Sequence, residues 1–129
     1  MSIEKVKPSL VIFPHPESYN QDHRAAATAT FTACRPASPN NKFQPRIILS
    51  YEFPGDLWSI GNTATLNFFI KLSETQLKNK LEALKLYKSQ IRQHPNPRSF
   101  KTIRSLAALR GAHSGNDLAE AFFSHRMIV

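Results

Sequence analysis

The sequence is poor in cysteine, since Cys34 is the single one among 129 residues. One cysteine excludes an internal disulfide framework and a zinc cluster built from paired cysteines. Long apolar runs are also lacking, because none approaches the roughly 18 residues that a transmembrane helix requires. The first ten residues, MSIEKVKPSL, contain no apolar core of the kind that a secretory signal needs. These absences predict a cytoplasmic protein with no membrane span.

Acidic residues are few relative to basic ones. Nine Asp and Glu stand against 17 Lys and Arg, which gives a formal net charge of +8 and a pI near 10.0. Hydrophobic residues make up 41% of the chain, which is enough for a folded core. The length predicts a single domain over residues 1–129.

The excess of basic residues is concentrated in one stretch. Ten basic residues but only Glu74 and Glu82 lie between Lys71 and Arg110, so this stretch alone carries a net charge of +8. Two interpretations are open, a solvated helix face or a binding surface for phosphate or nucleic acid. No zinc finger, helix-turn-helix or RNP-like aromatic motif accompanies the charge. A nucleic-acid partner is therefore the less favoured of the two.

The order of the predicted elements indicates an α/β protein. Apolar runs predict strands over 10–13, 46–53 and 67–72, and helical spacing predicts helices over 21–35, 73–94 and 98–110. Gly111 is expected to stop the last helix. Asn116 is expected to cap a turn through residues 119–122, and the tail 126–129 forms either a last strand or a frayed end. A strand–helix–strand order favours parallel strands, and so few strands indicate part of a larger sheet.

The loop after the first strand is the first candidate for a site, because ligands of open α/β sheets bind beyond the carboxyl ends of the strands. This loop, from Pro14 to His23, contains two histidines and several polar residues. A histidine beside a carboxylate, as in Asp22-His23, is a frequent arrangement at metal sites. The alternative from the residues alone is an ordinary helix N-terminus with a solvated Asp and His.

Several ordered motifs resemble the LmbE/PIG-L family of zinc-dependent N-deacetylases. The resemblance covers nearly the whole chain, about Ile3 to Ile128. It rests on four segments: SLVIFPHPESYNQDHRAAATATFTACRP, ILSYEFPGDLW, KNKLEALKLYKSQI and RSFKTIRSLAALRGAHSGNDLAEAFFSHRMI. It implies a partial Rossmann-like (LmbE-like) sheet with flanking helices that lacks the N-terminal half of the fold. Residues 1–129 would then be the C-terminal part of a deacetylase domain.

The resemblance also implies the chemistry of the site. A zinc ion would activate water for attack on an acetamido group of a sugar-like small molecule. His23 matches the family's third metal ligand, and Asp22 matches the adjacent aspartate that tunes or orients a histidine. Asn20 stands where many members have a histidine that stabilises the oxyanion, and an asparagine amide can donate a hydrogen bond there. Ser18 departs from the family pattern, because an aspartate is common at its position.

The family's first motif, A-H-P-D-D-E, is absent from the sequence. Two metal ligands and the general base are missing with it, whereas a catalytic zinc site normally has three protein ligands. We therefore expect the chain to bind zinc only if the missing ligands are supplied, and to be inactive alone. Three explanations stay open: one half of a split enzyme, a truncated product, or a remnant kept for binding. The expected partners are an N-terminal half or a second copy of the chain.

Other residues carry weaker expectations. Arg110 and Glu120 fall in the family's closing segment and are candidates for substrate binding, with helix packing or a salt bridge as the alternative. Trp58 either stacks on a sugar or takes part in hydrophobic packing. The remaining histidines outside the loop, His94, His113 and His125, are expected on the surface or in loops. The alternative function is a non-catalytic basic module that contacts nucleic acid or another anionic partner.

Overall fold

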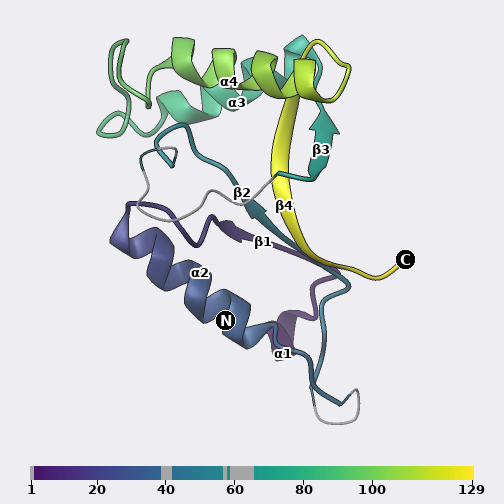
Figure 1. Ribbon diagram of the computed structural model, residues 1–129. Coiled ribbons are helices and arrows are strands. Elements are labelled where there is room, and N and C mark those ends of the chain that lie inside the picture. Colours follow the sequence, from purple (N-terminus) through teal and green to yellow (C-terminus); the bar gives the residue numbers. More distant parts are fainter. Residues whose placement is uncertain (1, 39–41, 57, 59–65) are drawn as a thin grey trace. The chain divides into compact units, whose positions relative to one another are not determined.

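The computed structural model describes residues 2–38, 42–56, 58 and 66–129. Residues 39–41, 57 and 59–65, which fall between strands and helices predicted from the sequence, lie outside the described residues. Within the described ranges the chain forms four helices and four strands, and Figure 1 labels them. In chain order they are α1 (Ile3–Val6), β1 (Leu10–Pro14), α2 (Gln21–Ala33), β2 (Ile47–Tyr51), β3 (Phe68–Lys71), α3 (Glu74–Lys85), α4 (Phe100–His113) and β4 (Ala119–Met127). The predicted α/β class is confirmed.

The strands form one mixed sheet in the order β1-β2-β4-β3. β1 and β2 are parallel, as predicted, with Leu10 opposite Ile47 and Pro14 opposite Tyr51. β4 runs antiparallel to β2, which the parallel prediction missed. The register between them shifts at Ile48 and Leu49, whose partners are Arg126 and Ser124, so the pairing skips His125. Such a bulge bends a strand and redirects a side chain.

The chain divides into two compact units. Unit 1 comprises residues 1–67 and 122–129, and unit 2 comprises residues 68–121. β4 belongs to both, because its residues up to Ala121 lie in unit 2 and those from Phe122 lie in unit 1. Each unit has a hydrophobic core of its own.

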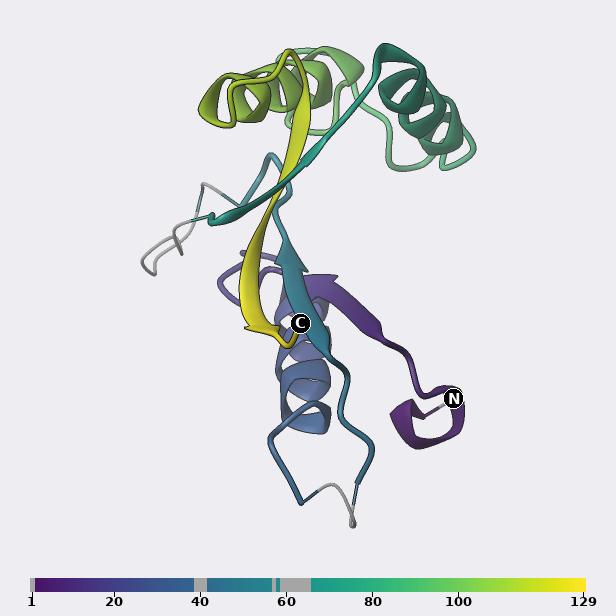
Figure 2. The same ribbon diagram turned by 90° about the vertical axis from the view of Figure 1, so that its right-hand side faces the viewer.

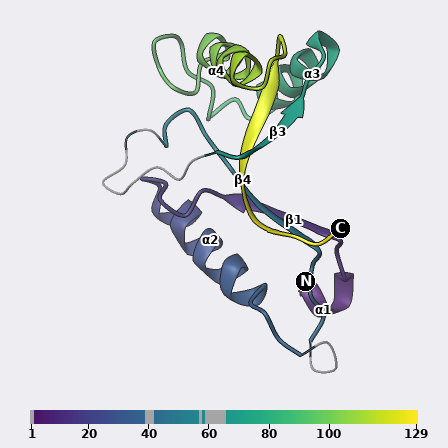
Figure 3. The same cartoon turned by 45° about the vertical axis from the view of Figure 1, so that its right-hand side comes forward.

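The core of unit 1 lies between α2 and the strands β1 and β2. Its buried residues are Phe13, Ala27, Cys34 and Ile48. Figure 3 shows α2 lying along β1. The helix begins where Asn20 caps it, with its side chain accepting a hydrogen bond from the backbone N–H of Asp22. The alanine-rich sequence then favours helix, as predicted.

The core of unit 2 joins α3, α4 and the residues before β4. Leu77, Ala107 and Leu118 are buried there, and Leu72 and Leu81 pack against them. The predicted capping box is confirmed, since the Ser73 and Gln76 side chains each accept a hydrogen bond from the other's backbone N–H. In Figure 2 the two helices can be told apart by colour, α3 in teal and α4 in yellow-green.

The helix predicted over 73–94 ends at Lys85. Beyond that point Leu86 is 81% exposed and Tyr87 is 64% exposed. Because most helical stability in proteins comes from burying an apolar face, the spacing of these two residues does not suffice to extend the helix.

Two further boundaries differ from the predictions. α4 runs through Gly111 to His113, and the residue with positive φ is Gly115. Gly111 is required for close packing instead, since a Cβ there would lie 2.5 Å from the Asp117 carbonyl oxygen. The turn predicted over 119–122 is replaced by β4, which begins at Ala119. Of the two alternatives for the tail, the last strand is confirmed at Arg126 and Met127, where β4 ends. No helix in the described ranges has the length and apolarity to cross a bilayer.

Candidate functional site

Ser18, in the loop between β1 and α2, contacts the ring of His23. Ser18 is fully buried, and its Oγ lies 3.3 Å from Nδ1 of His23. The same Oγ accepts a hydrogen bond from the backbone N–H of Asn20 at 3.3 Å, and the Ser18 N–H donates to the carbonyl of His15 at 3.2 Å. His23 therefore stands at the start of α2 with one ring nitrogen engaged. Its Nε2 has no hydrogen-bond partner among the described residues.

Asn20 and Asp22 flank this histidine in different ways. Asn20 Oδ1 accepts the N–H of Asp22 at 2.9 Å, which leaves the amide nitrogen for another acceptor. Asp22 is exposed in the first turn of α2, where a carboxylate is favourable beside the helix dipole. Its carboxylate makes no hydrogen bond with the described histidines, so the orienting role of Asp22 stays a prediction. The structure thus brings Asn20, Asp22 and His23 together at one helix end.

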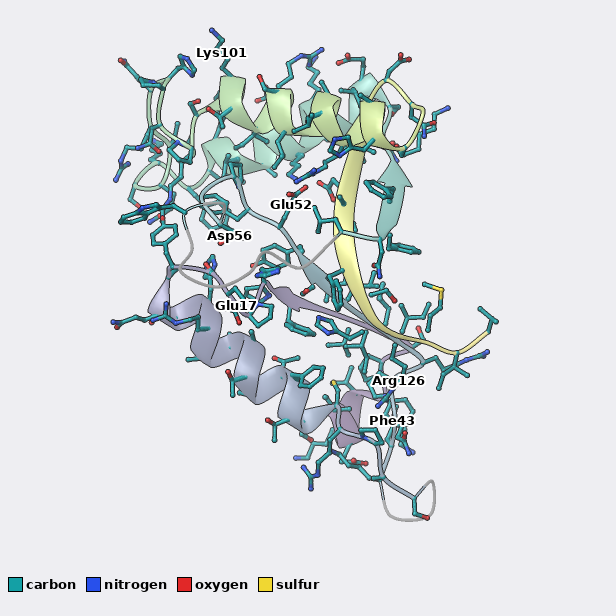
Figure 4. All side chains as sticks on the ribbon, in the orientation of Figure 1. Glu17, Phe43, Glu52, Asp56, Lys101 and Arg126 are labelled. Carbon is teal, nitrogen blue, oxygen red and sulfur yellow. The ribbon has the colours of Figure 1, made fainter. Side chains whose placement is uncertain are left out.

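A second loop, which follows β2, lies against the first. The rings of His23 and Phe53 meet edge to face, with centroids 6.4 Å apart. The Phe53 N–H donates to Asp56 Oδ2 at 2.8 Å, whereas Asp56 Oδ1 is buried with no hydrogen-bond partner in the described part of the chain. Burial and the Asp56 charge raise the pKa of Tyr51. Figure 4 labels Glu17, Glu52 and Asp56, three of the carboxylates that these two loops carry.

Sequence reasoning missed a third histidine environment in unit 1. His125 is half-buried on β4, contrary to its expected place on the surface or in a loop. Its ring stacks on Phe13 with centroids 5.1 Å apart, and its Nε2 lies 3.0 Å from Ser50 Oγ. Burial lowers the pKa of His125, and the nearby His15 lowers it further. No local pattern reveals this position, because the bulge at His125 interrupts the alternation along β4 and the partners of the ring are far away in sequence.

The residues present do not by themselves fit a zinc ion. A catalytic zinc site has three protein ligands and one open position. In the part of the chain that the structure describes, no group of three or more His, Cys, Asp or Glu is arranged to hold a metal ion. His23 offers one imidazole nitrogen, so further ligands would have to come from elsewhere.

The other two candidate residues lie in unit 2. Glu120 forms an ion pair with Lys80, and Arg110 Nη1 lies 3.0 Å from Nδ1 of His113. The salt bridge of Glu120 matches the alternative that the sequence left open for it. A role of Arg110 and Glu120 in substrate binding stays a prediction.

A hollow of about 360 Å³ lies on unit 2 between α3 and α4. It is lined by Glu74, Thr75, Lys78, Leu81, Glu82, Lys85, Phe100 and Arg104. None of the residues predicted for the site borders it. Two ion pairs cross or edge this hollow, Arg104 with Glu74 and Lys85 with Glu82, which makes it a surface stabilised by exposed charges.

Comparison with known proteins connects this geometry to one type of fold. No protein-family model matches the chain, and no curated protein sequence matches it. The conserved protein TT1542 from Thermus thermophilus is similar in structure, with a TM-score of 0.72 and 20% identity over 98% of this chain and 56% of that one. The N,N'-diacetylchitobiose deacetylase from Pyrococcus horikoshii is similar with a TM-score of 0.68 and 17% identity over 95% of this chain and 47% of that one.

These similarities establish the fold. The chain has a mixed four-stranded sheet with flanking helices that matches part of a LmbE-like fold. It spans about half the length of these two solved structures.

Proposed function

We propose that this chain is one part of an N-deacetylase that acts on a sugar-like acetamido substrate. The observation that carries the proposal is the position of His23. It follows a parallel strand in a fold similar to that of a diacetylchitobiose deacetylase, and its Nδ1 faces Ser18 while its Nε2 is unengaged by the described residues. Ligands of α/β sheets gather at this end of the strands. His23, Asn20 and Asp22 are then this chain's contribution to the site.

Each of the three residues has a distinct role in this proposal. His23 binds through Nε2, as one ligand of a zinc ion whose other ligands come from a second segment. The Asn20 amide N–H donates to the oxygen that becomes negative during attack on the acetamido group, because its own Oδ1 is already engaged by the helix. Asp22 adds negative charge that favours a cationic or protonated neighbour.

An exposed sheet edge supports the need for a second segment. β1 pairs with β2 on one side and stands at the end of the strand order. Leu10 is 42% exposed and Ile12 is 44% exposed, on the face opposite to Phe13, which packs in the core. Parallel sheets are normally covered on both faces, and an apolar edge strand is a surface for pairing. An N-terminal half or a second copy of the chain would cover this edge.

The test is release of free amine from N,N'-diacetylchitobiose. The chain is assayed with zinc, alone and together with the polypeptide encoded directly upstream of it. We expect activity only when the two polypeptides are combined. His23→Ala should reduce this activity to background, and Asn20→Ala should reduce it about a hundredfold or more. His94→Ala, at an exposed histidine of unit 2 to which no site role is assigned, is the matched control and should leave the rate unchanged. A rate that survives His23→Ala would contradict the proposed site.

A second candidate, a basic module for anionic partners, is favoured by the charge of unit 2. This unit carries ten basic and four acidic residues, a net of +6. Lys80, Lys85 and Arg104 are paired with carboxylates, whereas Lys71 and Lys78 are exposed and form no ion pair among the described residues. A gel-retardation assay at low salt tests this candidate. Binding should weaken steeply as salt is raised, and absence of binding would remove it.

A further inference from the structure

Two aromatic side chains form an exposed surface beside the loop that holds His23. Trp58 is 81% exposed and Tyr19 is 40% exposed, and their ring centroids lie 5.8 Å apart with a tilt of 54°. Single exposed aromatic residues are common and need no explanation. Here, however, two rings from different loops contact each other, and Tyr19 lies between Ser18 and Asn20, which contact or flank His23 directly.

Gly55 brings the two loops together. A Cβ at Gly55 would lie 2.9 Å from Tyr19 Cε1 and 2.8 Å from Phe53 Cε1, so both side chains pack closely on this residue. The Trp58 N–H donates to the Gly55 carbonyl at 3.1 Å, which closes the turn that carries the indole. On the other side, Arg24 Nη1 donates to the Ser18 carbonyl at 3.2 Å and lies 3.4 Å from that of Tyr19. These contacts bring the Tyr19 and Trp58 rings side by side.

The charges around the rings select the type of ligand. Asp22 follows the loop of Tyr19, and Asp56 lies in the loop of Trp58, whereas the Arg24 guanidinium is engaged by the backbone carbonyls of Ser18 and Tyr19. The two carboxylates disfavour a nucleotide or another anion, although a base would stack on the rings equally well. The buried Asp56 Oδ1 still lacks a hydrogen-bond donor among the described residues. A neutral ligand with an apolar face and many hydroxyl donors fits this environment, and a pyranose ring has both.

We infer that Tyr19 and Trp58 form a stacking subsite for a neutral pyranose ring, beside the site of His23. Contacts connect the two regions, since the edge of His23 meets Phe53 and Gly55 lies against both Phe53 and Tyr19. The C–H face of the sugar packs on the rings, and its hydroxyls face the carboxylates and the Asn20 amide. The placement beside His23 rests on the proposed function, whereas the sugar binding does not. The subsite recognises the ring itself and not its acetamido group.

The test uses the chain as it is, without zinc or a second segment. Trp58 is the only tryptophan of the sequence, so its fluorescence reports this surface alone. Titration with cellobiose, a neutral disaccharide without acetamido groups, should change the emission with saturation at roughly millimolar Kd. Tyr19→Ala, which keeps the reporter, should weaken binding about tenfold, as loss of a stacking partner does. Tyr19→Phe should bind like the parent.

Tryptophan replacement needs a second measurement, for which saturation-transfer NMR with cellobiose is suitable. Trp58→Ala should abolish the transfer, whereas Tyr87→Ala, at an exposed tyrosine of unit 2, should not change it. The inference is overturned if cellobiose has no effect at any accessible concentration, or if a single-stranded oligonucleotide binds more tightly than cellobiose and loses binding with Trp58→Ala. Sugar binding without deacetylation in the assay above would reject the proposed function and leave the subsite standing. Deacetylation without cellobiose binding would reject the subsite and leave the proposed function standing.

Discussion

Unit 1 contains the candidate site, whereas unit 2 carries most of the net positive charge. Unit 1 carries seven basic and five acidic residues, a net of +2, and contains His15, His23 and His125. Unit 2 has a net charge of +6 and contains the hollow between α3 and α4, which no predicted site residue borders. The most conspicuous global property of the sequence, its basic charge, therefore lies mainly away from the candidate site. Local features, namely a capped helix end and a buried serine, accompany the candidate site, whereas the excess of basic charge does not.

The largest expected effect tests whether the two cores are independent. Leu77 is fully buried in unit 2, so Leu77→Ala should lower the free energy of unfolding by about 2–5 kcal/mol. Hydrogen exchange should show faster exchange in α3 and α4 while α2 keeps its protection. Leu86→Ala, at a residue that is 81% exposed, should change stability by no more than about 0.5 kcal/mol. Equal loss of protection in α2 would show that the units unfold together.

The next effect concerns the uncovered edge of unit 1. Ile12 is 44% exposed on β1, and Leu109 is 49% exposed on α4 of unit 2. Ile12→Lys should weaken association of the chain with itself or with the upstream polypeptide about tenfold, because a charge disfavours pairing at a strand edge. Leu109→Lys is the matched control and should have no effect. Sedimentation velocity over a range of concentrations measures both, and an equal effect of the two variants would argue against pairing through β1.

A smaller effect is the pH dependence of unit 1. Burial lowers the pKa of His125 below its ordinary value of 6.5, so the unfolded chain binds this proton at a higher pH than the folded chain. The free energy of unfolding should therefore fall as the pH is lowered from about 7.5 to about 5, because protons favour the unfolded state over this range.

Variants assign that slope to one histidine. His125→Gln keeps a hydrogen-bonding group near Ser50 without a charge and should flatten the dependence, measured by urea unfolding at several pH values. His113→Gln, in unit 2, should leave the slope as it is. If the pH dependence of the free energy of unfolding persists in His125→Gln, another titratable group causes it.

The smallest effect tests the surface charges of unit 2. Glu74 and Arg104 form an ion pair at 2.6 Å, with both side chains more than half exposed. Glu74→Gln should lower the free energy of unfolding by only about 0.2–1 kcal/mol, since water and salt screen exposed pairs. Thermal unfolding at low and high salt measures it. A loss as large as that of Leu77→Ala would show that charge, and not the apolar core, stabilises unit 2.

The elements that were predicted well have local causes. The Ser73 and Gln76 capping box and the alanine-rich α2 depend on residues adjacent in the chain, and both are present. The loop carrying Asn20, Asp22 and His23 was placed correctly at the end of β1 for the same reason. Ser18 was identified only as a departure from a family pattern, although its hydroxyl is what positions His23.

The elements that were predicted poorly depend on contacts between distant residues. Gly111 was assigned to a helix end, but the close approach of the Asp117 carbonyl is what requires it. His125 was expected at the surface because no local pattern reveals Phe13 or Ser50, which are far away in sequence. The antiparallel direction of β4 likewise follows from pairing with β2 and not from its own residues.

The burial of Cys34 has a practical consequence. Its thiol is 3% exposed in the core between α2 and the strands, and burial raises its pKa. A thiol that is both covered and protonated is nearly inert toward alkylating reagents. Because the chain has no other cysteine, the rate at which iodoacetamide labels the protein measures how often α2 lifts from β1. Labelling kinetics thus report the rate at which unit 1 opens, and unit 2 contributes no signal because it contains no cysteine.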